Sequence, residues 1–195
     1  MNTFVGPLRE LKEFNDIKDN IINKSLPVQI TGCIDSQKSH LAYALGNGYR
    51  HKLIITYSDI KAKEIYEDYR LYDREVYIYP AKDIIFYSAD IRGNAIVRER
   101  LKVLRRIIEN KRATIILTLD SGMDRLLPLG MVKERIITIN MDTTIDLQGI
   151  SEALSHLGYE RQGQVEAPGD FAIRGGIIDI FPLTEEAPYR IELWG

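Results

Sequence analysis

Short apolar runs alternate with amphipathic helical segments through the first two thirds of the chain, and this alternation limits the folds open to it. The runs are continuous rather than alternating in polarity, as in parallel strands that are buried on both faces. They lie at residues 28–31, 53–57, 76–79 and 114–119. Helices are predicted at residues 8–24, 41–45, 59–71 and 94–110. The pattern predicts an α/β domain with a parallel sheet covered on both faces.

Capping residues and apolar stripes refine this prediction. The 94–110 helix should bury Val97, Leu101, Leu104 and Ile108, which recur at helical spacing. Ser121 is predicted to cap a short helix that ends at Pro128.

The pattern changes after about residue 130. A strand at 136–139 and a helix at 147–157 precede two strands, 171–174 and 177–181, joined by Gly175 and Gly176. Adjacent glycines allow the positive φ angles of a tight hairpin turn. We therefore predict an α/β domain over residues 1–130 and a small α+β domain with a β-hairpin over 131–195. The strand at 189–194 has no terminus of its own, so we expect the chain to be a fragment of a longer protein.

Composition excludes several classes of protein. The 195 residues are 45% hydrophobic and 28% charged, as in ordinary globular proteins. No apolar run approaches the roughly 20 residues that span a bilayer, so we expect no membrane association. Cys33 is the only cysteine, which fits a reducing cytoplasm and excludes an internal disulfide. His40, His51 and His156 lack metal-ligand spacing with Cys33, so no metal site is predicted.

The best local match to a chemical motif lies between the first apolar run and the next helix. A phosphate-binding P-loop requires GxxxxGK[ST] between a strand and a helix. Gly32, Lys38 and Ser39 fit this pattern, but Gln37 replaces its second glycine and places a side chain where the backbone must approach the phosphate. The segment is either a purely structural turn or a degenerate phosphate loop, with a nucleotide-hydrolysing enzyme as an alternative.

Charge is distributed unevenly. Residues 1–138 hold 23 Lys or Arg and 18 Asp or Glu, whereas residues 139–195 hold 3 and 10. Within the first part, residues 98–112 hold seven basic and two acidic side chains, which suits either a solvated helix face or a DNA-binding surface. In the acidic part, Arg161, Arg174 and Arg190 either form intramolecular ion pairs or anchor a protein partner, since arginine is enriched at interface hot spots.

One long segment of the acidic part resembles a known family. It contains Gly158-Tyr159-Glu160-Arg161, then Gly169-Asp170-Phe171-Ala172-Ile173-Arg174-Gly175-Gly176-Ile177-Ile178-Asp179-Ile180-Phe181-Pro182, and finally Arg190-Ile191-Glu192-Leu193. This segment is similar to one shared by the excision-repair protein UvrB and the N-terminal region of the bacterial transcription-repair-coupling factors (the Mfd family). Gln37 breaks the loop that is intact in UvrB, and only about fourteen residues separate strand 76–79 from helix 94–110, too few for the DNA-gripping hairpin of UvrB. Both departures favour the coupling factors.

The resemblance implies a fold and a partner. The fold would be a degenerate P-loop-like domain, similar to UvrB domain 1a, followed by a small UvrA-binding domain. The UvrA-binding residues implied by the family pattern are Arg161, Phe171, Arg174, Arg190 and Glu192, with Ala172 in place of one family arginine. The fragment itself would be non-catalytic and hold no cofactor.

The resemblance also implies properties of the longer protein. It would be a cytoplasmic, ATP- and Mg²⁺-dependent DNA translocase that displaces stalled RNA polymerase, and its C-terminal region would mask the UvrA surface. The alternatives from the residues themselves are a P-loop-like nucleotide-binding enzyme and a DNA-binding module of an excision-repair protein.

Overall fold

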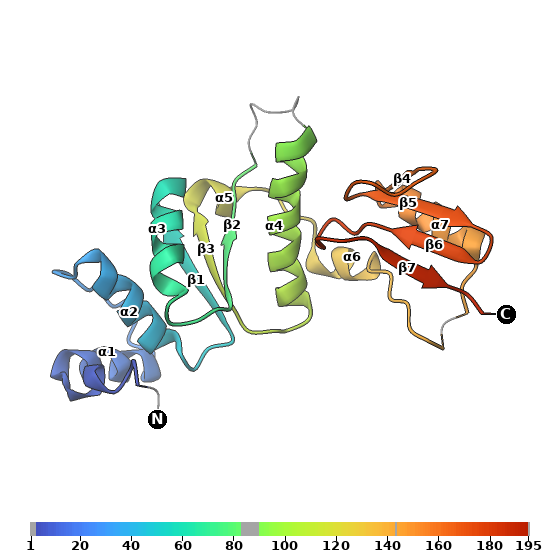
Figure 1. Ribbon diagram of the computed structural model, residues 1–195. Helices are drawn as coiled ribbons and strands as arrows, with labels where there is room; N and C mark the ends of the chain where they lie inside the picture. Colours follow the sequence, from blue (N-terminus) through green and yellow to red (C-terminus); the bar gives the residue numbers. More distant parts are fainter. Residues whose placement is uncertain (1–2, 83–89, 143, 195) are drawn as a thin grey trace. The chain divides into compact units, whose positions relative to one another are not determined.

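The computed structural model describes residues 3–82, 90–142 and 144–194; its elements are labelled in Figure 1. Of the described residues, 3–82 and 105–124 make one compact unit, and 90–104 with 125–194 make a second. Helix α4 (Asp90–Ile108) contributes to both units. The domain division predicted after residue 130 stays a prediction. Among the described residues, no helix is both long enough and apolar enough to cross a membrane.

The first unit is built on a three-stranded parallel sheet, as the sequence predicts. Its strands are β1 (His51–Thr56), β2 (Val76–Tyr79) and β3 (Ala113–Thr118), in the order β1-β3-β2. Its other helices are η1 (Pro7–Glu10), α1 (Lys12–Ile22), α2 (Asp35–Gly46), α3 (Asp59–Tyr69) and α5 (Leu119–Met123). Helix α3 contacts all three strands and α2 packs against α3 (Figure 1).

The central strand carries the core of this unit. All six residues of β3 are buried, which agrees with a continuous apolar run flanked by strands on both sides. The edge strand β1 differs, because Leu53 and Ile55 on one of its faces are 65% and 62% exposed. The expectation of a sheet covered on both faces is therefore right for β3 and wrong for β1 within the part of the chain described here.

Three local predictions in the first unit are wrong. Residues 28–31 form no strand, because only Val28 and Ile30 offer apolar surface and Ile30 stays exposed. The predicted 8–24 helix is two helices, η1 and α1, separated at Leu11, whose backbone is extended. Helix α5 is capped by Thr118 rather than Ser121, which occupies the third helical position and accepts a hydrogen bond from the Thr118 amide through its Oγ.

The predicted apolar stripe of α4 also differs from the one observed. Val97 is 43% exposed, whereas Arg100 and Val103 are buried. Helical spacing selects candidate faces, but it does not identify the face that packs.

The second unit contains a four-stranded sheet. Its helices are α6 (Leu129–Glu134) and α7 (Leu147–His156), and its strands are β4 (Glu160–Arg161), β5 (Asp170–Arg174), β6 (Ile177–Ile180) and β7 (Tyr189–Glu192), in chain order. Strands β4 and β5 are parallel, and the other pairs are antiparallel. The strand predicted at 136–139 does not form; Ile136 and Ile137 stay partly exposed in an irregular segment.

The predicted hairpin is confirmed, and glycine is needed at its two turn positions for different reasons. Strands β5 and β6 pair with Arg174 opposite Ile177, so Gly175 and Gly176 alone make the turn. Gly175 adopts a φ of 59°, a region that L-residues with a side chain rarely occupy. A Cβ at Gly176 would stand 3.3 Å from the Leu193 carbonyl oxygen, close to where the Leu193 amide bonds the Gly176 carbonyl.

We expect Ile116→Ala to lower the free energy of unfolding by about 2–5 kcal/mol, because Ile116 lies fully buried at the centre of β3. Urea unfolding followed by circular dichroism measures this loss. The matched control is Ile60→Ala on the exposed surface of α3, which should cost no more than about 0.5 kcal/mol. Equal losses in the two variants would contradict the assignment of the core.

Candidate functional site

The sheet of the second unit has two chemically different faces. Cross-strand register places Phe171, Ile173, Ile178, Ile180 and Ile191 on one face. Phe171 and Ile178 are almost fully buried, so this apolar face belongs to the core of the unit. The opposite face carries Ala172, Arg174, Ile177, Asp179, Arg190 and Glu192. We call this second set the arginine face.

Asp179 lies at the centre of the arginine face and binds both arginines. Its Oδ1 accepts a hydrogen bond from Arg190 Nε at 2.7 Å, and its Oδ2 accepts one from Arg190 Nη2 at 3.0 Å. Oδ2 also accepts a hydrogen bond from Arg174 Nη2 at 2.7 Å. The Asp179 side chain is 11% exposed, whereas those of Arg174 and Arg190 are each 57% exposed. One buried carboxylate therefore holds two arginines whose remaining surface faces solvent.

The electrostatics of this cluster follow from the same contacts. Hydrogen bonds from Arg190, and secondarily from Arg174, lower the pKa of Asp179 from its usual 3.8 to about 2, although burial alone would raise that pKa. The hydrogen bond to Asp179 in turn raises the pKa of Arg190. All three groups are charged at neutral pH, so the pairing of Arg174 and Arg190 within the chain, one of the two sequence interpretations, is present.

The other predicted partner-binding residues are placed differently. Glu192 lies on the arginine face, opposite Ile177 in register. Arg161 is exposed on β4, but it pairs in register with Phe171 and so lies on the face opposite Arg174 and Arg190. Phe171 has no exposed surface in this fold, because its ring lies in the core beneath the sheet. Its part in partner binding stays a prediction.

Asp179 is the functional candidate that the sequence reasoning missed. A signal for it existed, because an acidic residue interrupts the apolar run Ile177, Ile178 and Ile180. A two-residue glycine turn fixes the pairing of the two strands, so Asp179 must lie opposite Ala172 and diagonal to Arg174. The turn does not determine the register of β7, so the pairing of Arg190 with Asp179 could not be predicted from it.

In the degenerate phosphate loop, Asp35 forms ion pairs with two lysines, Lys38 and Lys61. Lys38 Nζ lies 3.0 Å from Asp35 Oδ1, and Lys61 Nζ lies 2.5 Å from Asp35 Oδ2. Hydrogen bonds from Lys61 and then Lys38 lower the pKa of Asp35 to about 2. Gln37 accepts a hydrogen bond from the Ile34 amide, and Ser39 is buried. The strand that a P-loop requires before it does not form.

Most basic side chains of the segment 98–112 form ion pairs within the chain. Lys102 lies 2.9 Å from Glu99, Arg105 lies 2.9 Å from Glu109, Lys111 lies 2.6 Å from Glu109, and Arg112 lies 3.3 Å from Asp73. Arg106 pairs with Glu75 and lies over the Tyr77 ring. These pairings favour the interpretation of a solvated helix face over that of a phosphate-tracking surface.

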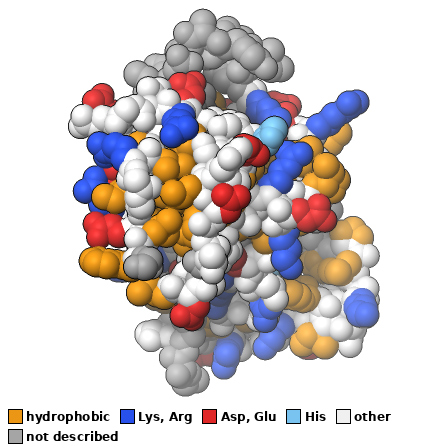
Figure 2. Space-filling model, turned by 90° about the vertical axis from the view of Figure 1, so that its right-hand side faces the viewer, with side chains coloured by type: hydrophobic (Ala, Val, Ile, Leu, Met, Phe, Trp, Pro, Cys, Tyr) orange, Lys and Arg blue, Asp and Glu red, His pale blue; other side chains and the backbone are white. Residues whose placement is uncertain are grey.

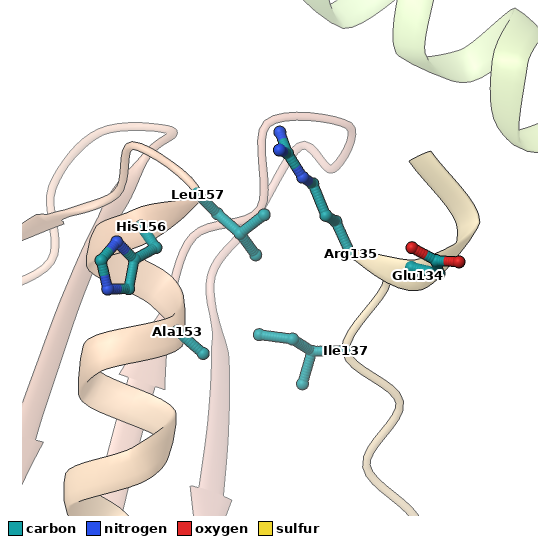
Figure 3. A pocket seen from close by; sticks show the side chains of 6 residues that line it. All are labelled: Glu134, Arg135, Ile137, Ala153, His156 and Leu157. Carbon is teal, nitrogen blue, oxygen red and sulfur yellow. The ribbon is translucent and has the colours of Figure 1, made fainter. Parts of the chain in front are cut away.

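A separate depression of about 500 Å³ lies between the end of α6 and α7 (Figure 3). It is lined by Glu134, Arg135, Ile137, Ala153, His156 and Leu157, none of which belongs to the predicted site. On the face of the molecule in Figure 2, apolar side chains are exposed between basic and acidic ones. Among the described residues, no group of three or more His, Cys, Asp or Glu side chains is placed to hold a metal.

The arginine face lies within a segment that defines a class of protein. Residues 137–195 match the family model described as the UvrB interaction domain. Over nearly its whole length, the chain is also similar to transcription-repair-coupling factors. It is 34% identical to the factor of Bacillus subtilis over 191 residues, and 30% identical to that of Staphylococcus haemolyticus over 186 residues. Each alignment covers 94% of this chain and 16% of the relative.

A third relative agrees with these two. The factor of Staphylococcus epidermidis is 30% identical over 170 residues, covering 86% of this chain and 14% of the relative. The resemblance predicted from the sequence is therefore confirmed. The chain spans about one sixth of the length of the curated relatives it matches.

We expect Asp179→Asn to lower the free energy of unfolding by about 1–3 kcal/mol at pH 7, because two arginines lose a charged hydrogen-bond acceptor. The folded pKa of about 2 lies below the unfolded value of 3.8, so the stabilisation is complete above the unfolded pKa. It is lost as pH falls through the folded pKa. Urea unfolding of both proteins at several pH values should show a constant difference above about pH 5 that shrinks toward pH 2. A difference that does not change with pH would contradict the charged pairing.

Proposed function

We propose that this chain is a non-catalytic interaction module that binds UvrA, as part of a longer transcription-repair-coupling factor. One observation carries the proposal: the segment that matches the UvrB interaction domain presents two solvent-exposed arginines held on one sheet face by Asp179. The similarity to transcription-repair-coupling factors supports the role in repair.

Recognition uses the arginine groups that Asp179 leaves free. A guanidinium has five N–H donors in a fixed fork. Asp179 takes two donors from Arg190 and one from Arg174, and the others remain for carboxylate or carbonyl oxygens of UvrA. Glu192 supplies an acceptor on the same face. Arg161, which is exposed on the edge strand β4 but lies on the opposite face of the sheet, would contact UvrA around that edge.

The first unit acts as a scaffold in this proposal, a degenerate relative of the P-loop-like UvrB domain 1a. Asp35 forms ion pairs with Lys38 and Lys61, and Gln37 replaces a glycine of the phosphate loop. The loop therefore binds no nucleotide. The module holds no cofactor of its own.

The remaining activities belong to parts of the longer protein outside these residues. They follow from the family resemblance: an ATP- and Mg²⁺-dependent motor that moves on DNA, contact with stalled RNA polymerase, and a C-terminal region that masks the UvrA surface. The whole protein works in the bacterial cytoplasm. Without the mask, this chain binds UvrA constitutively.

Calorimetric titration of the 195-residue chain with UvrA, without nucleotide, tests the proposal directly. We expect saturable binding, and we expect Arg174→Ala to weaken it by about 1–3 kcal/mol, the usual loss for a charged interface anchor. The matched control is Arg70→Ala, an exposed arginine of the first unit that pairs with Glu67 at 3.0 Å.

The Arg70→Ala protein should keep the wild-type affinity. Unchanged affinity of a folded Arg174→Ala protein would refute the arginine face as the binding site. An absence of binding by the wild-type chain would refute the proposed function itself.

A further inference from the structure

Asp179 is an unusual residue for its position in the sheet. Strand β6 is otherwise apolar, with Ile177, Ile178 and Ile180, yet it carries an aspartate whose side chain is only 11% exposed. Its cross-strand neighbour on β5 is Ala172, which is also buried and offers only a methyl group. Burying a carboxylate beside apolar groups is costly unless charged donors compensate it. The two arginines provide that compensation. In return, the charged Asp179 side chain holds both guanidinium groups in place.

The geometry restrains the two arginines to different degrees. Arg190 lies directly opposite Asp179 and donates from Nε and Nη2 to both carboxylate oxygens, which fixes the plane of its guanidinium. Arg174 lies diagonally across the hairpin and donates through Nη2 alone. Both side chains are more than half exposed, where long side chains otherwise sample many rotamers. Asp179 therefore orders the exposed ends of both arginines before any partner arrives.

We propose that Asp179 is a positioning residue for partner recognition: its buried carboxylate fixes the Arg174 and Arg190 guanidiniums in the geometry that the partner binds. The inference rests on the proposed function. Ordering a long side chain on binding costs affinity, and a side chain that is already ordered avoids that cost. In the part of the chain that the structure describes, the Asp179 carboxylate accepts hydrogen bonds from Arg174 and Arg190 and from no other side chain, so its effect on binding is indirect.

The substitution Asp179→Asn separates positioning from simple electrostatics. The variant removes one negative charge between two arginines, so the arginine face becomes more positive. If charge alone governed binding, an acidic partner surface would then bind more tightly, most clearly at low salt. Positioning predicts the opposite result. We expect the affinity of Asp179→Asn for UvrA to fall by about tenfold, at low as well as at moderate salt.

The matched control is Asp170→Asn on β5 of the same sheet. The Asp170 carboxylate accepts hydrogen bonds from the backbone amides of Glu166 and Ala167, not from an arginine. This variant also loses carboxylate hydrogen bonds within the second unit, but it leaves the Arg174–Asp179–Arg190 cluster intact. We expect its UvrA affinity to stay much closer to that of the wild type than the affinity of Asp179→Asn does. An equal loss in both variants would reduce Asp179 to a structural residue and overturn the inference.

A second measurement needs no partner and no variant. Nuclear magnetic resonance of arginine Nε–H groups in the free wild-type chain should show slow solvent exchange for Arg190, whose Nε donates to Asp179. Arg70 is the internal reference, since its hydrogen bonds to Glu67 come from Nη1. Equal exchange rates for Arg190 and Arg70 would overturn the inference even if Asp179→Asn failed to fold. In a folded Asp179→Asn protein, the Arg190 exchange rate should rise toward that of Arg70.

The outcomes distinguish this inference from the proposed function. If Arg174→Ala loses affinity but folded Asp179→Asn keeps or gains it, the interface stands and positioning by Asp179 is wrong. If the wild-type chain does not bind UvrA, both fail together. Loss of affinity in Asp179→Asn and Arg174→Ala, with retention in Asp170→Asn, supports both.

Discussion

Strand register in the second unit is the constraint on which the candidate site depends. Side chains alternate between the faces of a strand, so a shift of one residue would send Arg174 and Asp179 to the apolar side. The turn at Gly175 and Gly176 prevents this shift on one side of β6. On the other side, the Leu193 amide bonds the Gly176 carbonyl and continues the β6–β7 pairing beyond Glu192. Backbone pairing alone thus places Arg174, Asp179 and Arg190 on one face, and their ion pairs are a consequence of that placement.

The parts of the fold that could be predicted are those in which local pattern and tertiary burial agree. The β3 run is apolar throughout and fully buried, and the two-glycine turn allows essentially one hairpin. Residues 28–31 and 136–139 are apolar enough to resemble strands, yet neither segment forms a strand with any part of the chain that the structure describes. Strand formation requires a partner with free backbone groups, and a single sequence does not say which segments compete for one. For the same reason, the two-residue pairing of β4 with β5 could not be predicted from the sequence.

The site was predictable in its arginines but not in its organisation. Arg174 and Arg190 stand out because basic residues are rare after residue 138. Phe171 belongs to the same motif, yet alternation places it on the opposite face from Arg174, where it is buried. The hairpin register alone places Asp179 near Arg174, but its second partner, Arg190, is supplied only when β7 lies beside β6. A sequence motif identifies which residues belong together, whereas the register decides which of them reach solvent.

Ion pairing within the chain and recognition of a partner, which the sequence left as alternatives, are compatible in this arrangement. Asp179 binds the arginines from the buried side, and their exposed ends stay accessible. The cluster has a net charge of only +1, in a segment where acidic residues outnumber basic ones by ten to three. Such a surface exerts little long-range attraction on an acidic partner. Specific binding here must therefore come from short-range hydrogen bonds in a fixed geometry, which is what a buried carboxylate between two arginines provides.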